Sequence, residues 1–297
     1  MKISLLHNMA AGAGVSVEDL RRELARAGHT LVHASAKDGD IPRVLGATEL
    51  LVVAGGDGTV ARAAVALAGR AIPLAILPLG TANNIALSLG IEGSVADLVA
   101  GWTRAIPRPL DLGVARGAWG ESQFVEAVGS GLVSRAIAEV EGEPPDPDRD
   151  PAARLLHAAR RFRDVLARLR PHRATLTLDG ARMSGDFLLV EVLNIRSVGP
   201  NLVVSEDADP SDGVFHVVTA GEEHRREIDA YLGHKVAGRR SRLALPTRRA
   251  RQVEIQGCEE MHVDDQIRTR PLVSSISIRI QSGAVQVLPP PPGQVRK

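Results

Sequence analysis

A strand–loop–helix segment rich in glycine constrains the fold of this chain more than any other feature. In the segment LVVAGGDGTVARA, residues 51–63, four apolar residues are followed directly by GGDG and then by an alanine-rich run. The apolar residues predict a buried parallel strand, and residues 60–67 predict a helix. Glycines at such a junction let a ligand approach the backbone amides closely, and the N-terminus of a helix favours an anion such as phosphate. The segment therefore predicts an α/β fold with a phosphate-binding loop.

A single carboxylate, Asp57, stands among these glycines. It would repel a bare phosphate, so its position favours a nearby cation or a hydroxyl group of a ribose or substrate. The alternative is a tight turn with a solvated aspartate. A second glycine loop, PLGTANNIA from Pro78, follows the next apolar run. Taken alone, each polar residue of this loop fits an N-cap turn as well as it fits a ligand contact. Two such loops one βα unit apart favour a nucleotide site.

The hydrophobic pattern divides the chain into two parts. Near the N-terminus, predicted strands at 3–8, 29–35, 50–54 and 71–78 alternate with predicted helices at 17–27, 41–45, 60–67 and 85–89. This alternation predicts a parallel sheet, whose ligands bind at the carboxyl ends of the strands. From about residue 111 onward, short strands with period-2 alternation predict an antiparallel β-sandwich, interrupted by an arginine-rich helix at 152–169.

Composition excludes several classes of function. The net charge of +1 gives no global field that would attract nucleic acid, so we expect no nucleic-acid partner. The single cysteine, Cys258, excludes an intramolecular disulfide and fits a reducing compartment. No window approaches the roughly 20 apolar residues that span a bilayer. We therefore expect a cytoplasmic protein whose membrane contact, at the inner surface, is peripheral; whether it forms a homodimer stays open.

The two glycine loops together resemble a known family. GGDGTV, followed by ILPLGTANNIALSLGI, resembles the catalytic domain of the diacylglycerol kinase family, which includes soluble bacterial lipid kinases and sphingosine and ceramide kinases. NAD kinases and phosphofructokinases share the first loop, but their resemblance does not extend to the second. The resemblance implies an α/β nucleotide-binding domain, similar to NAD kinase, at 1–113 with 284–297. It also implies that residues 114–283 form a β-sandwich domain that binds the acceptor.

The resemblance also implies which residues contact ATP. The first loop meets the family's Asn-Pro-x-Ser-Gly only partly, Ser35 stands in place of a threonine, and Asn84 replaces a frequent aspartate. The implied nucleotide-binding residues are Asn8, Gly12, Ser35, Gly55, Gly56, Asp57, Gly58, Thr59, Gly80, Thr81 and Asn83.

Two motifs in the second half are implied to bind a metal and to accept a proton. By the resemblance, the Asp212 carboxylate and the carbonyls of Asp209 and Val214 hold a structural Mg²⁺, although ADPSDG alone reads as a turn. HVDDQI stands where the family has Asp-Gly-Glu, which supplies the base. Glutamine at 266 cannot accept a proton at neutral pH, so Asp264 or Asp265 is the candidate base. Alternation along a hairpin would place Asp264 and Gln266 on one face, which favours Asp264.

These features predict an ATP- and Mg²⁺-dependent kinase that phosphorylates a lipid hydroxyl, most simply converting diacylglycerol to phosphatidate, with Asp57 also catalytic. One alternative is a kinase for another acceptor, such as a sphingoid lipid or a soluble metabolite. Another is a nucleotide-binding relative that has lost catalysis, suggested by Gln266. Two basic segments are candidates for contact with an anionic membrane: the arginine face of helix 152–169 and the basic run 225–251. The alternative for both segments is a solvated outer face.

Overall fold

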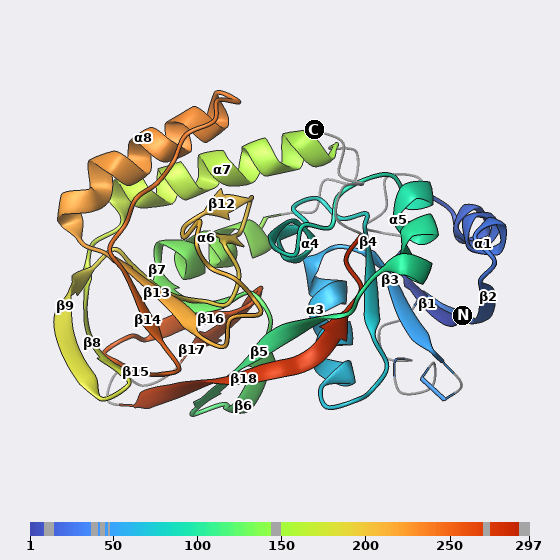
Figure 1. Cartoon of the computed structure of the whole chain (residues 1–297). Coiled ribbons are helices and arrows are strands. Elements are labelled where there is room, and N and C mark those ends of the chain that lie inside the picture. The colour runs from blue at the N-terminus through green and yellow to red at the C-terminus, as the bar shows by residue number, and fades with distance from the viewer. Residues whose placement is uncertain are drawn as a thin grey trace. The chain divides into compact units, whose positions relative to one another are not determined.

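The computed structural model describes residues 1–8, 15–36, 41, 45–46, 48–143, 150–269 and 274–290. The chain divides into two compact units, which are Met1–Leu112 with Ser282–Lys297, and Gly113–Gln281 (Figure 1). Gly12 and most of the acidic, proline-rich segment at 141–151 lie outside the described residues.

The first unit contains the parallel sheet that the sequence predicts. Its strand order is β2 (Thr30–Ser35), β1 (Lys2–His7), β3 (Leu50–Gly55) and β4 (Leu74–Pro78), and these pairings are all parallel. The end of β18 (Ser275–Val287) continues the sheet, where Val287 pairs with Leu74. Every residue of β3 is buried, as a central strand covered on both faces requires.

Helices follow these strands in the alternating order expected of an α/β unit. They are α1 (Val17–Arg26), α3 (Asp57–Leu67), α4 (Asn84–Ser88), α5 (Val95–Gly101) and the 3₁₀ turn η2 (Trp102–Arg104). Helix α1 begins with a capping box between Ser16 and Asp19 and buries Leu20 and Leu24. Helix α3 begins at Asp57, three residues earlier than the hydrophobic pattern predicts. The second half of the glycine loop is therefore the first turn of a helix.

The second unit is an antiparallel β-sandwich, which confirms the predicted fold class. One sheet has the order β14 (Thr247–Ala250), β13 (Phe215–Ala220), β10 (Leu189–Leu193), β7 (Ala127–Gly131), β16 (Glu260–Val263) and β17 (Gln266–Thr269). In the other, β18 pairs with β15 (Gln252–Gln256), followed by β8 (His172–Leu178) and β9 (Ala181–Phe187). β5 (Arg108–Gly117) pairs with β18 and with β6 (Gly120–Phe124), and a short hairpin joins β11 (Ser197–Val198) to β12 (Leu202–Val203).

Two hydrophobic cores hold the second unit together. Side chains from both sheets, among them Phe124, Val192, Phe215 and Ile255, form the core between them. The other core includes Phe162 and packs one sheet against the helices α6 (Leu132–Glu141), α7 (Pro151–Arg168) and α8 (Arg225–Val236); η3 (Glu222–His224) leads into α8. Helices α7 and α8 lie side by side (Figure 1). None of the described helices combines the length and the apolar character that crossing a bilayer requires.

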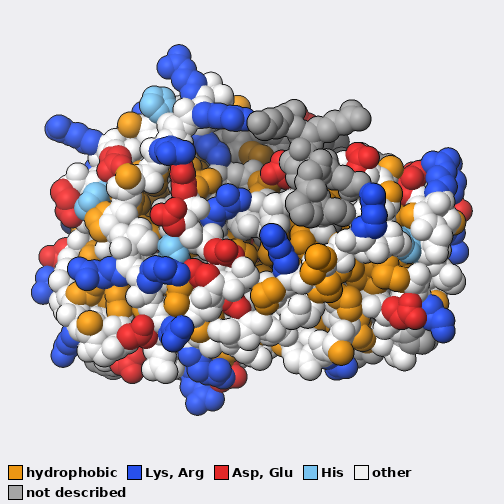
Figure 2. Space-filling view, viewed as in Figure 1, with side chains coloured by type: hydrophobic (Ala, Val, Ile, Leu, Met, Phe, Trp, Pro, Cys, Tyr) orange, Lys and Arg blue, Asp and Glu red, His pale blue; other side chains and the backbone are white. Residues whose placement is uncertain are grey.

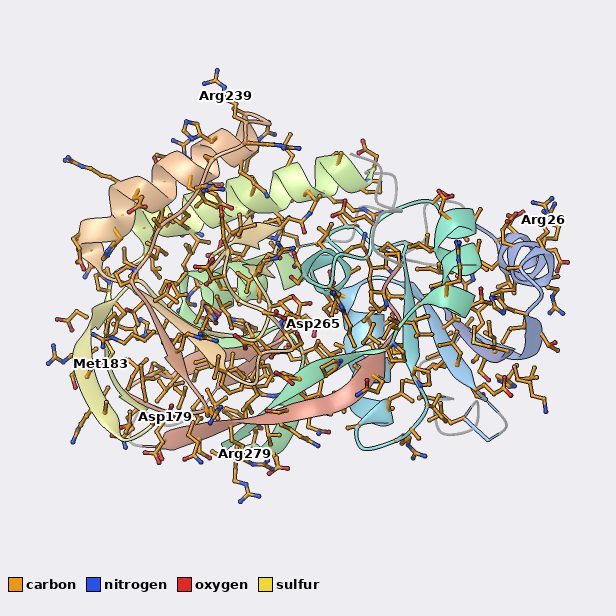
Figure 3. All side chains as sticks on the ribbon, in the orientation of Figure 1. Arg26, Asp179, Met183, Arg239, Asp265 and Arg279 are labelled. Atoms are coloured by element: carbon orange, nitrogen blue, oxygen red, sulfur yellow. The ribbon has the colours of Figure 1, made fainter. Side chains whose placement is uncertain are left out.

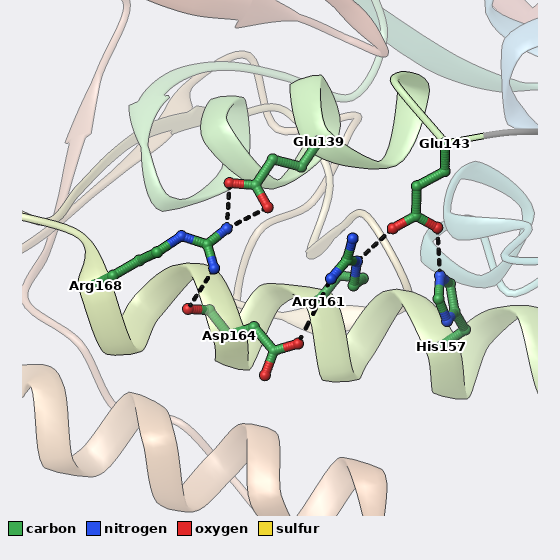
Figure 4. A network of polar contacts seen from close by, with 6 residues as sticks. All are labelled: Glu139, Glu143, His157, Arg161, Asp164 and Arg168. Carbon is green, nitrogen blue, oxygen red and sulfur yellow. Dashed lines mark hydrogen bonds and ion pairs between the residues drawn. The ribbon is translucent and has the colours of Figure 1, made fainter.

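The arginines of α7 are largely paired with acidic side chains. Arg161 binds Glu143 and Arg168 binds Glu139, so charges near α6 offset those of α7 (Figure 4). Arg163 donates two hydrogen bonds to Asp229 of α8, at 2.7 and 3.1 Å. These pairs connect α7 to its neighbours, which the sequence pattern could not show.

Candidate functional site

The register of the parallel strands brings the two glycine loops together at the carboxyl edge of the sheet. Gly55 of β3 pairs with Pro78 of β4, and the Leu79 amide donates to the Gly55 carbonyl at 3.1 Å. At the end of β1, the Asn8 amide donates to the Ala54 carbonyl at 3.0 Å. Ser35 lies at the end of β2, paired with Leu6. Most residues expected to bind the nucleotide thus follow neighbouring strands.

The loops contact each other backbone to backbone. A Cβ atom added to Gly80 would lie 2.3 Å from the Gly56 Cα and 2.8 Å from the Asn83 Oδ1. A Cβ on Gly56 would lie 3.2 Å from the Gly80 Cα. Real side chains do not tolerate such a short contact with backbone, so position 80 requires glycine because of its close approach to Gly56.

Asp57 links the two loops. Its Oδ1 accepts a hydrogen bond from the Ile85 amide at 2.9 Å, at the beginning of α4. Burial raises the pKa of the Asp57 carboxyl, whereas hydrogen bonds from the backbone amides of residues 83–85 act to lower it. The sequence predicted that a cation or hydroxyl would face this carboxylate. The structure adds that backbone amides of the second loop offset its charge.

Polar side chains complete this edge of the sheet. Asn83 adopts a left-handed conformation with φ of 55°; its Oδ1 accepts from the Gly80 amide and its Nδ2 donates to the Gly80 carbonyl, both at 2.9 Å. Asn83 therefore shapes the loop. Asn8 donates to the Thr59 hydroxyl at 3.3 Å, and Thr81 is partly exposed. No described side chain caps α3 at Gly56, and an uncapped helix N-terminus favours an anionic ligand.

In the second unit, Asp264 and Asp265 form the turn between β16 and β17. Asp264 has φ of 49°, and its carboxylate accepts hydrogen bonds from the backbone amides of residues 125, 126 and 127, at 3.1, 2.7 and 3.3 Å. Burial raises the pKa of Asp264 to about 6, although these amides act to lower it. Asp265 is exposed at the turn (Figure 3).

The expectation that Asp264 and Gln266 lie on the same face of this hairpin is wrong. Strand alternation does not apply to Asp264, because it lies in the turn and not in β16. Gln266 is exposed and accepts a hydrogen bond from Arg268, whereas the Asp264 carboxylate is directed to the chain before β7. Sequence reasoning missed the three amides of residues 125–127, because hydrogen bonds to a distant segment leave no local pattern.

Comparison with known proteins identifies the family. Residues 2–115 match the diacylglycerol kinase catalytic domain, and residues 149–288 match the YegS C-terminal NAD kinase beta sandwich-like domain. A diacylglycerol kinase of Mycobacterium tuberculosis is 31% identical over 247 residues, covering 76% of this chain and 75% of that protein. The chain belongs to the diacylglycerol kinase family.

A second relative agrees with the assignment to the diacylglycerol kinase family, and a solved structure agrees with the fold. A probable lipid kinase YegS-like from Pseudomonas aeruginosa is 33% identical over 224 residues, covering 72% of this chain and 70% of the relative. The crystal structure of a putative diacylglycerol kinase from Bacillus anthracis matches 98% of this chain and 97% of its own, with a TM-score of 0.73 and 19% identity. At that identity the match supports the fold alone.

The metal site that the diacylglycerol kinase resemblance implies is not supported by the contacts of its residues. The Asp212 carboxylate accepts from the Arg249 guanidinium at 2.6 Å and from the Val214 amide at 3.1 Å. The Asp209 carbonyl accepts from the Asp212 amide at 3.3 Å. Arg249 already supplies a positive charge to Asp212, so these residues fit Mg²⁺ poorly.

The contact between the glycine loops makes a specific prediction. Gly80→Ala adds only one methyl group, yet it would push the second loop away from Gly56. We expect ATP affinity to fall by about tenfold or more, which corresponds to at least about 1.4 kcal/mol. Isothermal titration calorimetry measures this. Gly46→Ala is the matched control, because a Cβ at Gly46 meets no atom within 4 Å; equal affinity of the two variants would contradict the role of the contact.

Proposed function

We propose that this protein transfers the terminal phosphoryl group of Mg²⁺-bound ATP to a hydroxyl group of diacylglycerol, producing phosphatidate. The observation that carries the proposal is the pair of glycine loops that Asp57 joins at the carboxyl edge of a parallel sheet. Membership of the diacylglycerol kinase family supports a lipid kinase. The choice of diacylglycerol follows the mycobacterial relative, which is a diacylglycerol kinase.

Each part of the first unit has a role in the proposed reaction. Phosphoryl transfer depends mainly on alignment of donor and acceptor and on stabilisation of the charge on the transferred group. Gly55, Gly56 and Gly80 would let the phosphates approach the backbone, and the N-terminus of α3 would favour their charge. Asn8, Ser35, Thr59 and Thr81 would contribute neutral donors and acceptors. The Mg²⁺ that accompanies ATP would offset further phosphate charge.

We propose Asp265 as the group that accepts the proton of the lipid hydroxyl. Asp264 is engaged by three backbone amides, whereas the Asp265 side chain is exposed one residue away. Asp264 would then maintain the turn, and Asp265 would act as the general base. This reverses the order that strand alternation had favoured.

The first experiment measures whether the protein is a lipid kinase. Purified protein with labelled ATP, Mg²⁺ and diacylglycerol in mixed vesicles should yield labelled phosphatidate. Asp57→Asn keeps an oxygen that can accept from Ile85 but removes the charge, so we expect it to fold normally and to lose most of the activity. Absence of labelled phosphatidate from the parent protein, with labelling of a sphingoid lipid or soluble acceptor, would reject diacylglycerol as substrate. No labelling of any acceptor despite ATP binding would favour a non-catalytic relative.

A second experiment separates the two aspartates of the turn. Asp265→Asn should lower kcat by roughly 10²- to 10⁴-fold, the usual contribution of a general base, without changing the melting temperature. Asp264→Asn should lower the melting temperature, because its amide group cannot accept all three backbone hydrogen bonds. Gln266→Glu should preserve or raise activity. The opposite result, with full activity in Asp265→Asn and a lost kcat but normal stability in Asp264→Asn, would identify Asp264 as the base.

We propose that the segment after α8, and not α7, contacts an anionic membrane. Arg239 and Arg240 are exposed and make no ion pair with a described residue, whereas Arg161 and Arg168 are paired. The Arg239 side chain points away from the end of α8 (Figure 3). Elsewhere, basic and acidic side chains are interspersed on the face shown in Figure 2. An unpaired local cluster is therefore the better candidate for attraction to lipid phosphates.

Vesicle binding tests this surface. Arg239→Gln with Arg240→Gln removes two charges that contribute about 1 kcal/mol each, so binding to anionic vesicles should weaken by roughly 30-fold. Activity on a soluble short-chain diacylglycerol should stay unchanged. Arg21→Gln with Arg22→Gln removes the same net charge from α1, where both arginines are paired, and serves as the control. A larger loss for Arg161→Gln with Arg168→Gln would place the contact on α7 instead.

A further inference from the structure

Glu191 and His262 form a buried polar pair in the sheet that carries the Asp264–Asp265 turn. Glu191 lies on β10 and is 0% exposed; His262 lies on β16 and is 1% exposed. The Glu191 Oε2 is 2.9 Å from the His262 Nε2. Glu191 belongs to no motif of the sequence, although a single acid in the apolar strand LVEVL is unusual enough to mark it. His262 is the first residue of HVDDQI, but the sequence assigned it no role.

The strand between them is built to let the two side chains meet. Gly129 of β7 pairs with Glu191 on one side and with His262 on the other. A Cβ on Gly129 would lie 2.2 Å from the Glu191 Oε2. Glycine at this position therefore allows the glutamate to cross over β7 and reach the imidazole, so three residues on three strands form one arrangement.

The second ring nitrogen of His262 contacts the turn. Its Nδ1 is 2.8 Å from the Asp264 backbone carbonyl, which can only accept, so this nitrogen carries a proton. Asp264 adopts a left-handed conformation, which is unfavourable for a residue with a side chain unless its surroundings maintain it. The turn is therefore held twice, by His262 at its carbonyl and by the amides of residues 125–127 at its carboxylate.

Stability alone does not account for the pair. Burial raises the pKa of Glu191, and the Glu191 Oε1 has no hydrogen-bond partner among the described residues. Burial acts to lower the pKa of His262, but the neighbouring Glu191 raises it above its usual range. Apolar residues of similar volume often replace a buried charged pair without loss of stability, because desolvation offsets the attraction. A role in geometry explains the pair better.

We propose that Glu191 and His262 are positioning residues for phosphoryl transfer, which orient the Asp264–Asp265 turn so that its exposed carboxylate meets the acceptor hydroxyl. Glu191 fixes the imidazole from one side, and the imidazole fixes the Asp264 carbonyl from the other. The inference rests on the proposed function, because it concerns the same turn. Its effect on the hairpin does not depend on any substrate, and this allows a separate test.

The test compares two substitutions of His262 that differ in which nitrogen they imitate. His262→Asn places an amide nitrogen near the position of Nδ1 and can still donate to the Asp264 carbonyl. His262→Gln extends toward Glu191 and loses that donor. We expect His262→Gln to lower kcat by roughly 10²-fold, the scale of a small misplacement in an active site, with the KM for ATP unchanged. His262→Asn should retain most of kcat.

A double variant removes the pair without leaving an unpaired charge. Glu191→Leu with His262→Leu should melt at the parent temperature or above it, yet it should lose kcat as His262→Gln does. In the absence of substrate, backbone hydrogen exchange of the 260–269 peptide should become faster in the double variant and in His262→Gln. Ser130→Ala is the control, because Ser130 is buried on β7 beside Gly129 and contacts His172 and Cys258 but not the turn. It should change neither kcat nor exchange.

The outcomes separate the two proposals. Parent-like kcat and parent-like exchange in the double variant would overturn the positioning role. The positioning role would also be overturned if kcat fell only in variants that have a lower melting temperature, and if His262→Asn and His262→Gln had equal effects. Those results would indicate a purely structural role for the pair. If the parent phosphorylates no acceptor, the proposed function fails, and exchange of the 260–269 peptide then decides by itself whether the pair holds the turn.

Discussion

The candidate nucleotide site depends on the contact between two glycine loops. Parallel pairing of β3 with β4 brings the loops side by side, and the absence of side chains at Gly56 and Gly80 lets them touch. Asp57 then joins them through the Ile85 amide. A carboxylate in a phosphate-binding loop would be electrostatically unfavourable without compensation, and the amides at the beginning of α4 provide it. The hydrogen bonds between the Asp57 carboxylate and these amides thus hold the two loops together and also offset the negative charge of Asp57.

The second unit places its polar groups by a different principle. A buried polar atom without a hydrogen-bond partner is costly, so the buried acids of the sandwich draw on donors in distant segments, although the Glu191 Oε1 has no partner among the described residues. Asp264 finds them in the chain before β7, and Glu191 finds one in His262 across Gly129. What remains exposed at the turn is Asp265. Exposure, and not similarity of motif, is therefore the ground on which we propose Asp265 as the proton acceptor and Asp264 as the residue that maintains the turn.

Sequence reasoning succeeded where local pattern governs structure. The apolar run at 51–54 and the alternation of strands and helices predicted the parallel sheet, and period-2 patterning predicted the sandwich. Helix α7 begins at Pro151, one residue from the predicted start, because Asp150 caps it. The failures concern long-range contacts. Neither the Arg161–Glu143 and Arg168–Glu139 pairs nor the Arg249–Asp212 pair has a signature within a few residues of sequence.

The sequence by itself determined the fold class and the family and located the segments of the candidate site, because glycine spacing and hydrophobic periodicity act over neighbouring residues. Only the tertiary structure decided how individual charged groups are used. Strand register joins Asp57 to Ile85, and the left-handed conformation of Asp264 overrides strand alternation in its hairpin. The reason is physical, since the protonation and direction of a carboxylate depend on the donors and the solvent around it, and packing brings those donors from 28 to 139 residues away.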